Sequence, residues 1–324
     1  MSKQLASIAA LGAAILLGAS PVRAQDYPAK PVELVIPFAA GGATDVIGRL
    51  VAQVVSEKWG QPVVVQNRAG ATGAIGSEYV VRAAPDGYTI LMATASTHAV
   101  LPAYRADLKY DTVTSFAPAT LIATFPNMLV VNPRKVPVKT VAEFIDHLKQ
   151  NKSKMNFGSS GAGSSIHFAG ELFKQMTGTT MEHVPYRGSA PAMTDLLAGN
   201  VDCMFDNMSN VWPQVQQGSL RALGVASVKR TPLAPDVPTI AETVPGYEAT
   251  SWVGIVAPAG TPQPIVDKIS RAFAEAMKNP DIIKRLTDLG ATAETNSPAE
   301  FKTFITEDRA KWVKLAKDAR LESQ

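Results

Sequence analysis

Cysteine is scarce in this chain, which has only one, Cys203, among 324 residues. A single thiol cannot close an intramolecular disulfide, so a packed core must stabilise the fold. Cys203 lies inside the apolar run 201–205, where we expect a buried core thiol. The chain is long enough to build two cores of ordinary size.

Long apolar runs are missing after residue 24. Before it, Lys3 precedes an apolar stretch at 5–18, and Val22, Arg23 and Ala24 form a small-residue cleavage motif. That stretch is shorter than the roughly 20 apolar residues of a membrane anchor. The sequence therefore predicts a signal peptide at 1–24, which is cleaved when the protein is exported.

An excess of one charge is also missing once residues 1–24 are removed. Of the 31 Lys and Arg, Lys3 and Arg23 are then lost, which leaves 29 basic against 28 acidic residues. Nucleic-acid binding calls for a basic face, so we expect no nucleic-acid partner. The histidines at 98, 147, 167 and 183 lack metal-ligand spacing, and we expect neither a metal nor a cofactor.

Motifs for nucleotide binding and hydrolysis are missing as well. The turn at 158–165 is not followed by Gly-Lys-Ser/Thr, and the loop at 70–76 lacks the spacing G-x-G-x-x-G. No G-x-S-x-G nucleophile motif occurs, which argues against a hydrolase. We expect a binding protein and not an enzyme.

What the sequence does contain is an alternation of short apolar runs with amphipathic segments, which predicts an α/β fold with mostly parallel sheets flanked by helices. The expected strands are 33–38, 63–66, 88–92, 121–131, 154–158, 201–206, 221–227 and 252–258. The expected helices include 45–59 and 165–176, and capping boxes at 140–143 and 297–300 begin two more.

The pattern favours two lobes. A chain that crosses to a second lobe near 121–131 and returns near 250–258 would join its lobes by a two-strand hinge. We expect residues 25–122 plus 252–324 to form lobe 1 and residues 123–251 to form lobe 2.

Two glycine-rich turns, each between an apolar run and an amphipathic segment, are the main functional signal. Such turns leave backbone N–H groups at a helix start free to bind an anion. The candidate ligand-binding residues are Ala40, Gly41, Gly42, Ala43, Thr44 and Asp45 in the first turn, and Ser159, Ser160, Gly161, Gly163 and Ser164 in the second. Two turns about 120 residues apart suggest that two lobes grip one acidic ligand.

Three further features accompany these turns. Asp45 should cap its helix or hold water, since its charge would oppose a nearby anion. Asp206 and Asn207 end an expected strand and could receive an amine, a hydroxyl or water. Tyr186 and Arg187 either line the cleft or, for Arg187, form an ion pair between the lobes.

At these motifs the chain resembles the Bug family, the periplasmic receptors of tripartite tricarboxylate transporters. The resemblance rests on Pro37-Phe38-Ala39-Ala40-Gly41-Gly42-Ala43-Thr44-Asp45, Asn67-Arg68-Ala69-Gly70-Ala71-Thr72-Gly73, Pro85-Asp86-Gly87-Tyr88-Thr89, 158–164 with His167, 184–188, 238–242 and 258–262. It covers essentially the whole chain after residue 24. Each motif is weak alone, but their order and spacing are specific.

The resemblance implies a two-lobed periplasmic binding protein of the second type that closes on a small organic carboxylate. It also implies that Ser96, Thr97 and His98 lie at the cleft, after the strand at 88–92, and that transporter membrane subunits are the partner. We expect a monomer. A binding protein that feeds a sensor kinase, and an enzyme on the same scaffold, stay open as alternatives. The sequence does not choose among malate, citrate, glutamate and an aromatic acid.

Overall fold

The computed structural model describes residues 27–151, 155–319 and 321, so the expected signal peptide at 1–24 lies outside the described residues. Its strands are β1 (Val32–Ile36), β2 (Val63–Asn67), β3 (Thr89–Thr94), β4 (Phe116–Val131), β5 (Asn156–Ser159), β6 (Glu182–Pro185), β7 (Cys203–Asn207), β8 (Arg221–Val225), β9 (Thr250–Pro258) and β10 (Thr292–Ala293). Its α-helices are α2 (Ala43–Trp59), α3 (Ala74–Val81), α4 (Leu101–Tyr104), α5 (Val141–Asn151), α6 (Ser165–Thr177), α7 (Ser189–Ala198), α8 (Met208–Gln216), α9 (Gln263–Ala276), α10 (Pro280–Asp288) and α11 (Pro298–Ala319). Short helical turns span Ala71–Gly73, Ser96–Val100 and Ile240–Glu242.

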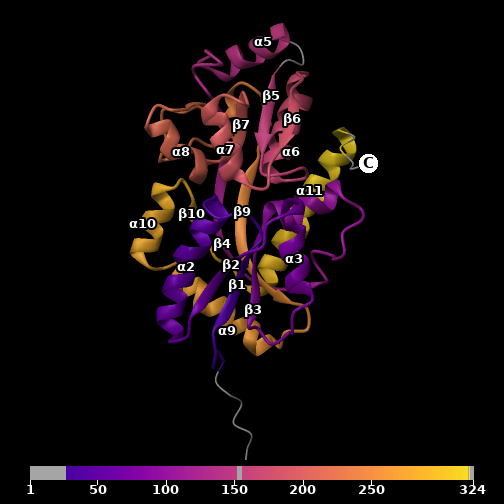
Figure 1. Cartoon of the computed structure of the whole chain (residues 1–324), viewed down its shortest axis with the longest axis vertical. Coiled ribbons are helices and arrows are strands. Elements are labelled where there is room, and N and C mark those ends of the chain that lie inside the picture. The colour runs from indigo at the N-terminus through magenta and orange to yellow at the C-terminus, as the bar shows by residue number, and fades with distance from the viewer. Residues whose placement is uncertain (1–26, 152–154, 320, 322–324) are drawn as a thin grey trace, which may run out of the picture.

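These elements form two α/β lobes, one above the other in Figure 1. In the first lobe, β1 pairs in parallel with β2 and β3, and β9 adds antiparallel to β3. In the second lobe, β5 pairs in parallel with β6 and β7, and β4 pairs antiparallel with β7 and β8. Each sheet is mixed and flanked by helices, which confirms the expected fold class.

The buried strands and the helix that follows β1 explain this packing. β1 is buried at four of its five positions, as expected of a strand covered on both faces. Ile47, Val51 and Val55 form one buried stripe on α2, which ends at Gly60 in the left-handed conformation. The start of α2 is thereby fixed at the carboxyl end of β1, on the side that faces the second lobe.

Two antiparallel strands connect the lobes. β4 pairs with β9 as far as Pro126 and with β7 from Asn127 onward, so it leaves one sheet and joins the other at this point. Pro126 has no N–H to donate, which suits the position where the ladder changes partner. The Asn127 N–H donates to Ala249 O at 3.1 Å, which holds β4 beside the start of β9.

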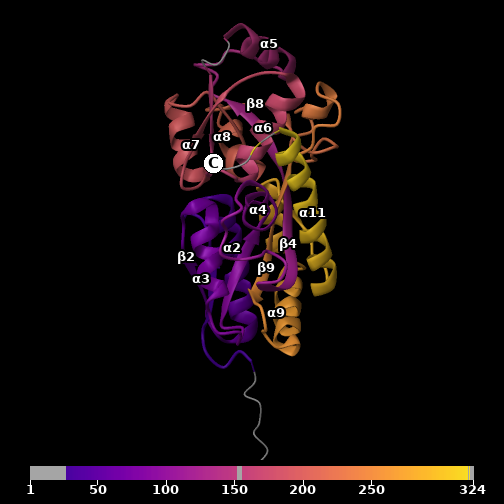
Figure 2. The ribbon, with the colours of Figure 1, turned by 90° about the vertical axis from the view of Figure 1, so that its right-hand side faces the viewer.

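Helix α11 lies along the side of both lobes (Figure 2) and packs against β4, α6 and the turn at Ser96–Val100. Its Asp308 carboxylate accepts hydrogen bonds from the indole N–H groups of Trp252, at 2.7 Å, and Trp312, at 3.0 Å. Trp252 is on β9, so α11 is tied to a crossing strand by a buried polar contact.

The sequence patterns at the helix starts are confirmed at two places. Glu143 N–H donates to Thr140 Oγ1 at 3.1 Å, and the Glu143 carboxylate accepts the Lys139 N–H. Ser297 and Glu300 bond each other reciprocally before α11. Within the described ranges, no helix combines the length and apolar character that a bilayer crossing needs.

Candidate functional site

A small cavity of about 30 Å³ lies between the lobes, where helix starts from both lobes converge. Its walls come from the loop after β1, the carboxyl ends of β3 and β7, both crossing strands, and the starts of α2, α6 and α7. The lining residues are Phe38, Ala39, Gly42, Ala43, Thr44, Thr94, Ala95, Ser96, Phe125, Ser160, Ser165, Ile166, Ser189, Asn207, Ser251, Trp252 and Val253. None of these side chains carries a charge.

On the first lobe the cavity meets the start of α2. Gly42 is the N-cap, with φ −81° and ψ 168°, and no side chain caps the helix. Ala43 and Thr44 follow it and line the cavity. The first amides of a helix have no partner within that helix, so this start presents donors and partial positive charge to the cavity.

Asp45 is not the N-cap, which corrects that expectation. It is the third residue of α2, and its carboxylate accepts the Gly41 N–H at 3.0 Å, Arg49 Nε at 3.0 Å and Asn67 Nδ2 at 2.8 Å. Burial raises the Asp45 pKa, but these hydrogen bonds outweigh burial and leave the pKa below its usual value. Asp45 therefore fixes the glycine turn from outside the cavity.

On the second lobe two further helices begin at the cavity without a side-chain cap. Gly188 is the N-cap of α7 and Asn207 is the N-cap of α8. Ser189, the first residue of α7, and Asn207 both line the cavity. Three uncapped helix starts from two lobes thus surround one space whose lining has no charged side chain.

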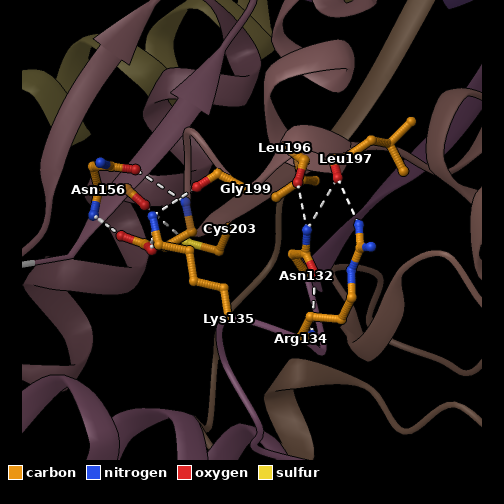
Figure 3. Close-up of polar contacts among 9 residues, drawn as sticks. Asn132, Arg134, Lys135, Asn156, Leu196, Leu197, Gly199 and Cys203 are labelled. Carbon is orange, nitrogen blue, oxygen red and sulfur yellow. Dashed lines mark hydrogen bonds and ion pairs between the residues drawn. The ribbon is translucent and has the colours of Figure 1, made fainter.

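The far end of α7 is anchored by polar groups that follow β4 (Figure 3). Asn132 Nδ2 and Arg134 donate to Leu197 O, and Lys135 Nζ donates to Gly199 O at 2.8 Å. These donors satisfy carbonyls at the helix C-terminus, where cations are also favoured by the helix dipole. The anchor holds α7 with its start directed at the cavity.

Asp206 lies directly behind the second-lobe wall. It is fully buried, and its carboxylate accepts the Ser189 hydroxyl at 3.0 Å, the Asn207 N–H at 2.7 Å and Asn210 Nδ2 at 2.6 Å. Burial raises the Asp206 pKa to about 6, although the three donors favour the ionised form. Asp206 positions two lining residues and does not itself line the cavity.

A chain of hydroxyls crosses from one lobe to the other. Ser96 Oγ accepts the Ser165 N–H at 3.0 Å and lies 3.1 Å from Ser165 Oγ. Ser251 Oγ donates to Ser165 Oγ at 3.0 Å and lies 3.3 Å from Asn127 Oδ1. The first amide of α6 is therefore bound by a serine of the opposite lobe.

Of the residues expected from the sequence to bind the ligand, the structure brings six to the cavity: Gly42, Ala43, Thr44, Ser96, Ser160 and Asn207. Two line a neighbouring hollow: Gly161 and Tyr186. Nine lie outside the cavity lining: Ala40, Gly41, Asp45, Thr97, His98, Ser159, Gly163, Ser164 and Asp206.

Several of these nine support the site from behind. Thr97 and His98 are fully buried, with Thr97 Oγ1 2.9 Å from His98 Nδ1, and burial lowers the His98 pKa to about 3. Ser164 Oγ accepts the His167 N–H at 3.1 Å and so serves as the N-cap of α6. Its hydroxyl is engaged by the helix.

Ser159 is also engaged within the second glycine turn. Its Oγ lies 2.6 Å from His183 Nε2 and 3.1 Å from Gly161 O, and its side chain is fully buried. A serine beside a histidine can suggest a nucleophile, but this serine lies outside the cavity lining. The pair stabilises the turn.

Sequence reasoning missed eleven of the seventeen residues that line the cavity. Phe38, Phe125 and Trp252 belong to the wall, with the Trp252 indole bonded to Asp308 of α11, and Ser189 and Ser251 supply hydroxyls. Ser189 directly follows a motif residue, Gly188, and this adjacency was an available signal. No local sequence motif pointed to Phe125, because its place in the wall depends on where β4 changes sheets.

No group of three or more His, Cys, Asp or Glu side chains suited to a metal occurs in the part of the chain that the structure describes. The arrangement instead suits a small anion with an apolar portion. Backbone amides and hydroxyls would bind the anionic group, and the aromatic side chains would cover the remainder.

Comparison with known proteins agrees with this geometry. Residues 47–321 match the family model described as "Tripartite tricarboxylate transporter family receptor". The chain is 39% identical to a Rhodopseudomonas palustris protein, Rpa4515, solved with adipate, with a TM-score of 0.88 over 91% of this chain and 98% of that one.

Two other solved structures are similar. The periplasmic binding protein BugD is 35% identical, with a TM-score of 0.88 over 92% of this chain and 100% of that one. MatC from Rhodopseudomonas palustris, solved with bound malate, is 32% identical, with a TM-score of 0.86 over 89% of this chain and 99% of that one. This chain belongs to the tripartite tricarboxylate transporter receptor family, the Bug-type periplasmic solute-binding proteins.

Proposed function

We propose that this protein is a non-catalytic receptor that captures a small organic carboxylate and delivers it to the membrane subunits of a tripartite tricarboxylate transporter. One observation carries the proposal: the uncapped starts of α2, α7 and α8, from two lobes, surround one cavity whose lining has no charged side chain. Adipate and malate in the structures of relatives support a carboxylate ligand.

Closure of the lobes is the proposed mechanism. A helix start stabilises an anion by about 0.3–2 kcal/mol, whereas micromolar affinity requires about 8 kcal/mol, so one helix is insufficient. The cavity, about 30 Å³, is also far smaller than an ordinary ligand pocket of roughly 300–1,000 Å³, so the lobes would have to separate for a ligand to enter. The ligand would bind one open lobe first, and closure would add the contacts of the other.

The moving units we propose are residues 25–122 with 252–324, and residues 123–251. The boundaries fall on β4 and β9, the two strands that connect the lobes. Export to the periplasm, after removal of residues 1–24, would place this receptor beside its membrane partner.

Calorimetry on the protein lacking residues 1–24 tests the proposal. Adipate, malate, citrate, glutamate and benzoate form a suitable panel, and at least one should bind with micromolar affinity and be recovered chemically unchanged. If none of them binds, the proposal is wrong.

Two substitutions at one position test the role of the helix start. Gly42→Asp and Gly42→Asn both provide a side chain that caps α2, and the φ and ψ of Gly42 suit either residue. Both should weaken carboxylate binding by occupying the amides, and aspartate should weaken it further through charge repulsion. Unchanged affinity in both variants would exclude the α2 amides as ligand donors, and thermal unfolding serves as the folding control.

A further inference from the structure

A second hollow, of about 590 Å³, adjoins the cavity between the lobes. It is lined by residues 70–73 of the first lobe, by residues 161–162, 185–187 and Pro191 of the second lobe, and by Phe38. We call this hollow the vestibule. Phe38 also lines the inner cavity, so it belongs to the walls of both spaces.

The vestibule has one charged residue in its lining, Arg187, and no carboxylate. Arg187 is exposed, and it has no hydrogen-bond or ion-pair partner among the residues that the structure describes. The Asp195 carboxylate, which lies near this segment, is engaged by the Tyr186 hydroxyl at 2.6 Å and by Asn200 at 3.0 Å. The interlobe ion pair considered for Arg187 is therefore not formed, and its guanidinium is free to attract an anion.

Among the described residues, one hydrogen bond between the lobes joins the two sides of the vestibule. Thr72 Oγ1 donates to Ala162 O at 2.5 Å. Ala71 and Thr72 have φ values of +48° and +55°, in the left-handed region that non-glycine residues rarely adopt. Separation of the lobes would break this bond and widen the passage beside Phe38.

We propose that the vestibule is the access route of the anionic ligand and that Arg187 captures the carboxylate before the lobes close. This inference rests on the proposed function. Arg187 does not line the inner cavity, so in the closed complex the carboxylate is held by amides and hydroxyls and has left the guanidinium. A cation at the mouth of a concave site raises the local concentration of anions and hence the association rate.

Stopped-flow measurement of adipate binding tests this capture step. Trp252 lines the cavity and provides a fluorescence signal. Arg187→Gln should lower the association and dissociation rate constants by the same factor, roughly threefold or more, at low ionic strength, because a contact made only before closure leaves the affinity unchanged. The difference should fade at high salt, where exposed charges are screened. Arg187→Lys keeps the charge and should retain most of the rate.

Lys149→Gln is the matched control. It removes the same charge from an exposed side chain on α5, at the far end of the second lobe (Figure 1), and should leave both rate constants unchanged. Equal association rate constants in Arg187→Gln and the wild type would overturn the inference. A change in the dissociation rate constant alone would also overturn it, because Arg187 would then contact the ligand in the bound complex. If the wild type binds neither adipate nor any other acid of the panel, the proposed function itself is overturned, and this inference with it.

Discussion

At the scale of single residues, two stacked histidines support the second glycine turn. The rings of His167 and His183 are 3.8 Å apart, and His167 Nδ1 accepts the Gly163 N–H at 3.1 Å. His183 Nε2 lies 2.6 Å from Ser159 Oγ. Both contacts bring imidazole rings to the turn that carries Ser160, so the two rings support the cavity wall from behind.

This arrangement predicts a pH-dependent stability. Burial lowers the His183 pKa to about 3, with further contributions from His167 and Lys174. The unfolded chain takes up this proton near pH 6.5, so the stability that His183 contributes is complete above that pH and is lost as pH falls toward 3. His183→Gln should flatten the pH dependence of unfolding by up to about 1.4 kcal/mol per pH unit between pH 6.5 and 4.

Urea unfolding at several pH values measures this effect. His147→Gln is the control, because His147 lies on α5 outside the stacked pair. His98 is present in both variants, so its own effect cancels in the comparison. A His183→Gln protein with the pH dependence of the wild type would contradict the role given to the pair.

At the scale of helices, the helix starts that meet at the cavity differ in whether a side chain caps them. α6 is capped by the Ser164 hydroxyl, whereas α2, α7 and α8 have no side-chain cap. An uncapped start costs stability when its amides are buried, unless a ligand binds them. α3, α4 and α9 also lack a side-chain cap but begin outside the cavity lining, so the uncapped starts at the cavity, α2, α7 and α8, are those that we propose hold the anion.

Ser164→Ala should therefore reduce the free energy of unfolding by about 1 kcal/mol and leave carboxylate affinity nearly unchanged. Ser164→Thr should retain the cap and the stability. Urea unfolding and calorimetry together make the measurement.

Ser160→Ala provides the opposite case. Ser160 lines the cavity, so loss of its hydroxyl should weaken binding by roughly 0.5–1.5 kcal/mol, with little effect on unfolding. If Ser164→Ala weakens binding as much as Ser160→Ala does, the assignment of the Ser164 hydroxyl to the helix alone is wrong.

At the scale of the whole molecule, the two lobes are in close contact. The structure joins them by the Thr72–Ala162 hydrogen bond and by the serine contacts at Ser165. A Cβ at Gly161 would lie 2.6 Å from Thr72 Oγ1, so a larger residue cannot fit while the lobes touch. Gly161 also has a φ of +135°, which L side chains rarely adopt, so both the backbone and the closed arrangement favour glycine here.

Gly161→Ala should keep the lobes apart. We expect a larger radius of gyration in the presence of ligand by small-angle X-ray scattering, and an affinity at least roughly tenfold lower, a loss of about 1.4 kcal/mol. Gly218→Ala is the control, since Gly218 also has a positive φ, +73°, but has no neighbouring atom within 4 Å of the added Cβ. Equal compaction of Gly161→Ala and the wild type would argue against closure at this contact.

Much of the fold followed from the sequence because its signals are local. The alternation of apolar runs and amphipathic segments predicted the strands and helices, and the capping boxes at Thr140 and Ser297 predicted two helix starts. Cys203 was expected in a core and is fully buried. These features depend on neighbours within a few residues, so the sequence shows them directly.

The candidate site was only partly predictable because its wall is assembled from distant segments. Local pattern pointed to the glycine turns but could not show which polar side chains are hydrogen-bonded within the protein. Asp45 accepts the Gly41 N–H, Ser164 accepts the His167 N–H, and Asp206 accepts the Ser189 hydroxyl. Each of these polar side chains suits a ligand equally well in isolation. The tertiary contacts assign them to the scaffold.

The sequence by itself determined the α/β alternation, the glycine turns and the resemblance to a receptor family, because periodicity and turn chemistry act over short stretches of chain. Only the tertiary structure decided which helix starts stay uncapped, where β4 changes sheets and that Phe38, Phe125 and Trp252 line one cavity. Those features arise from contacts between segments more than 70 residues apart, such as Ser251 with Ser165 at a separation of 86 residues, and these depend on how the whole chain packs.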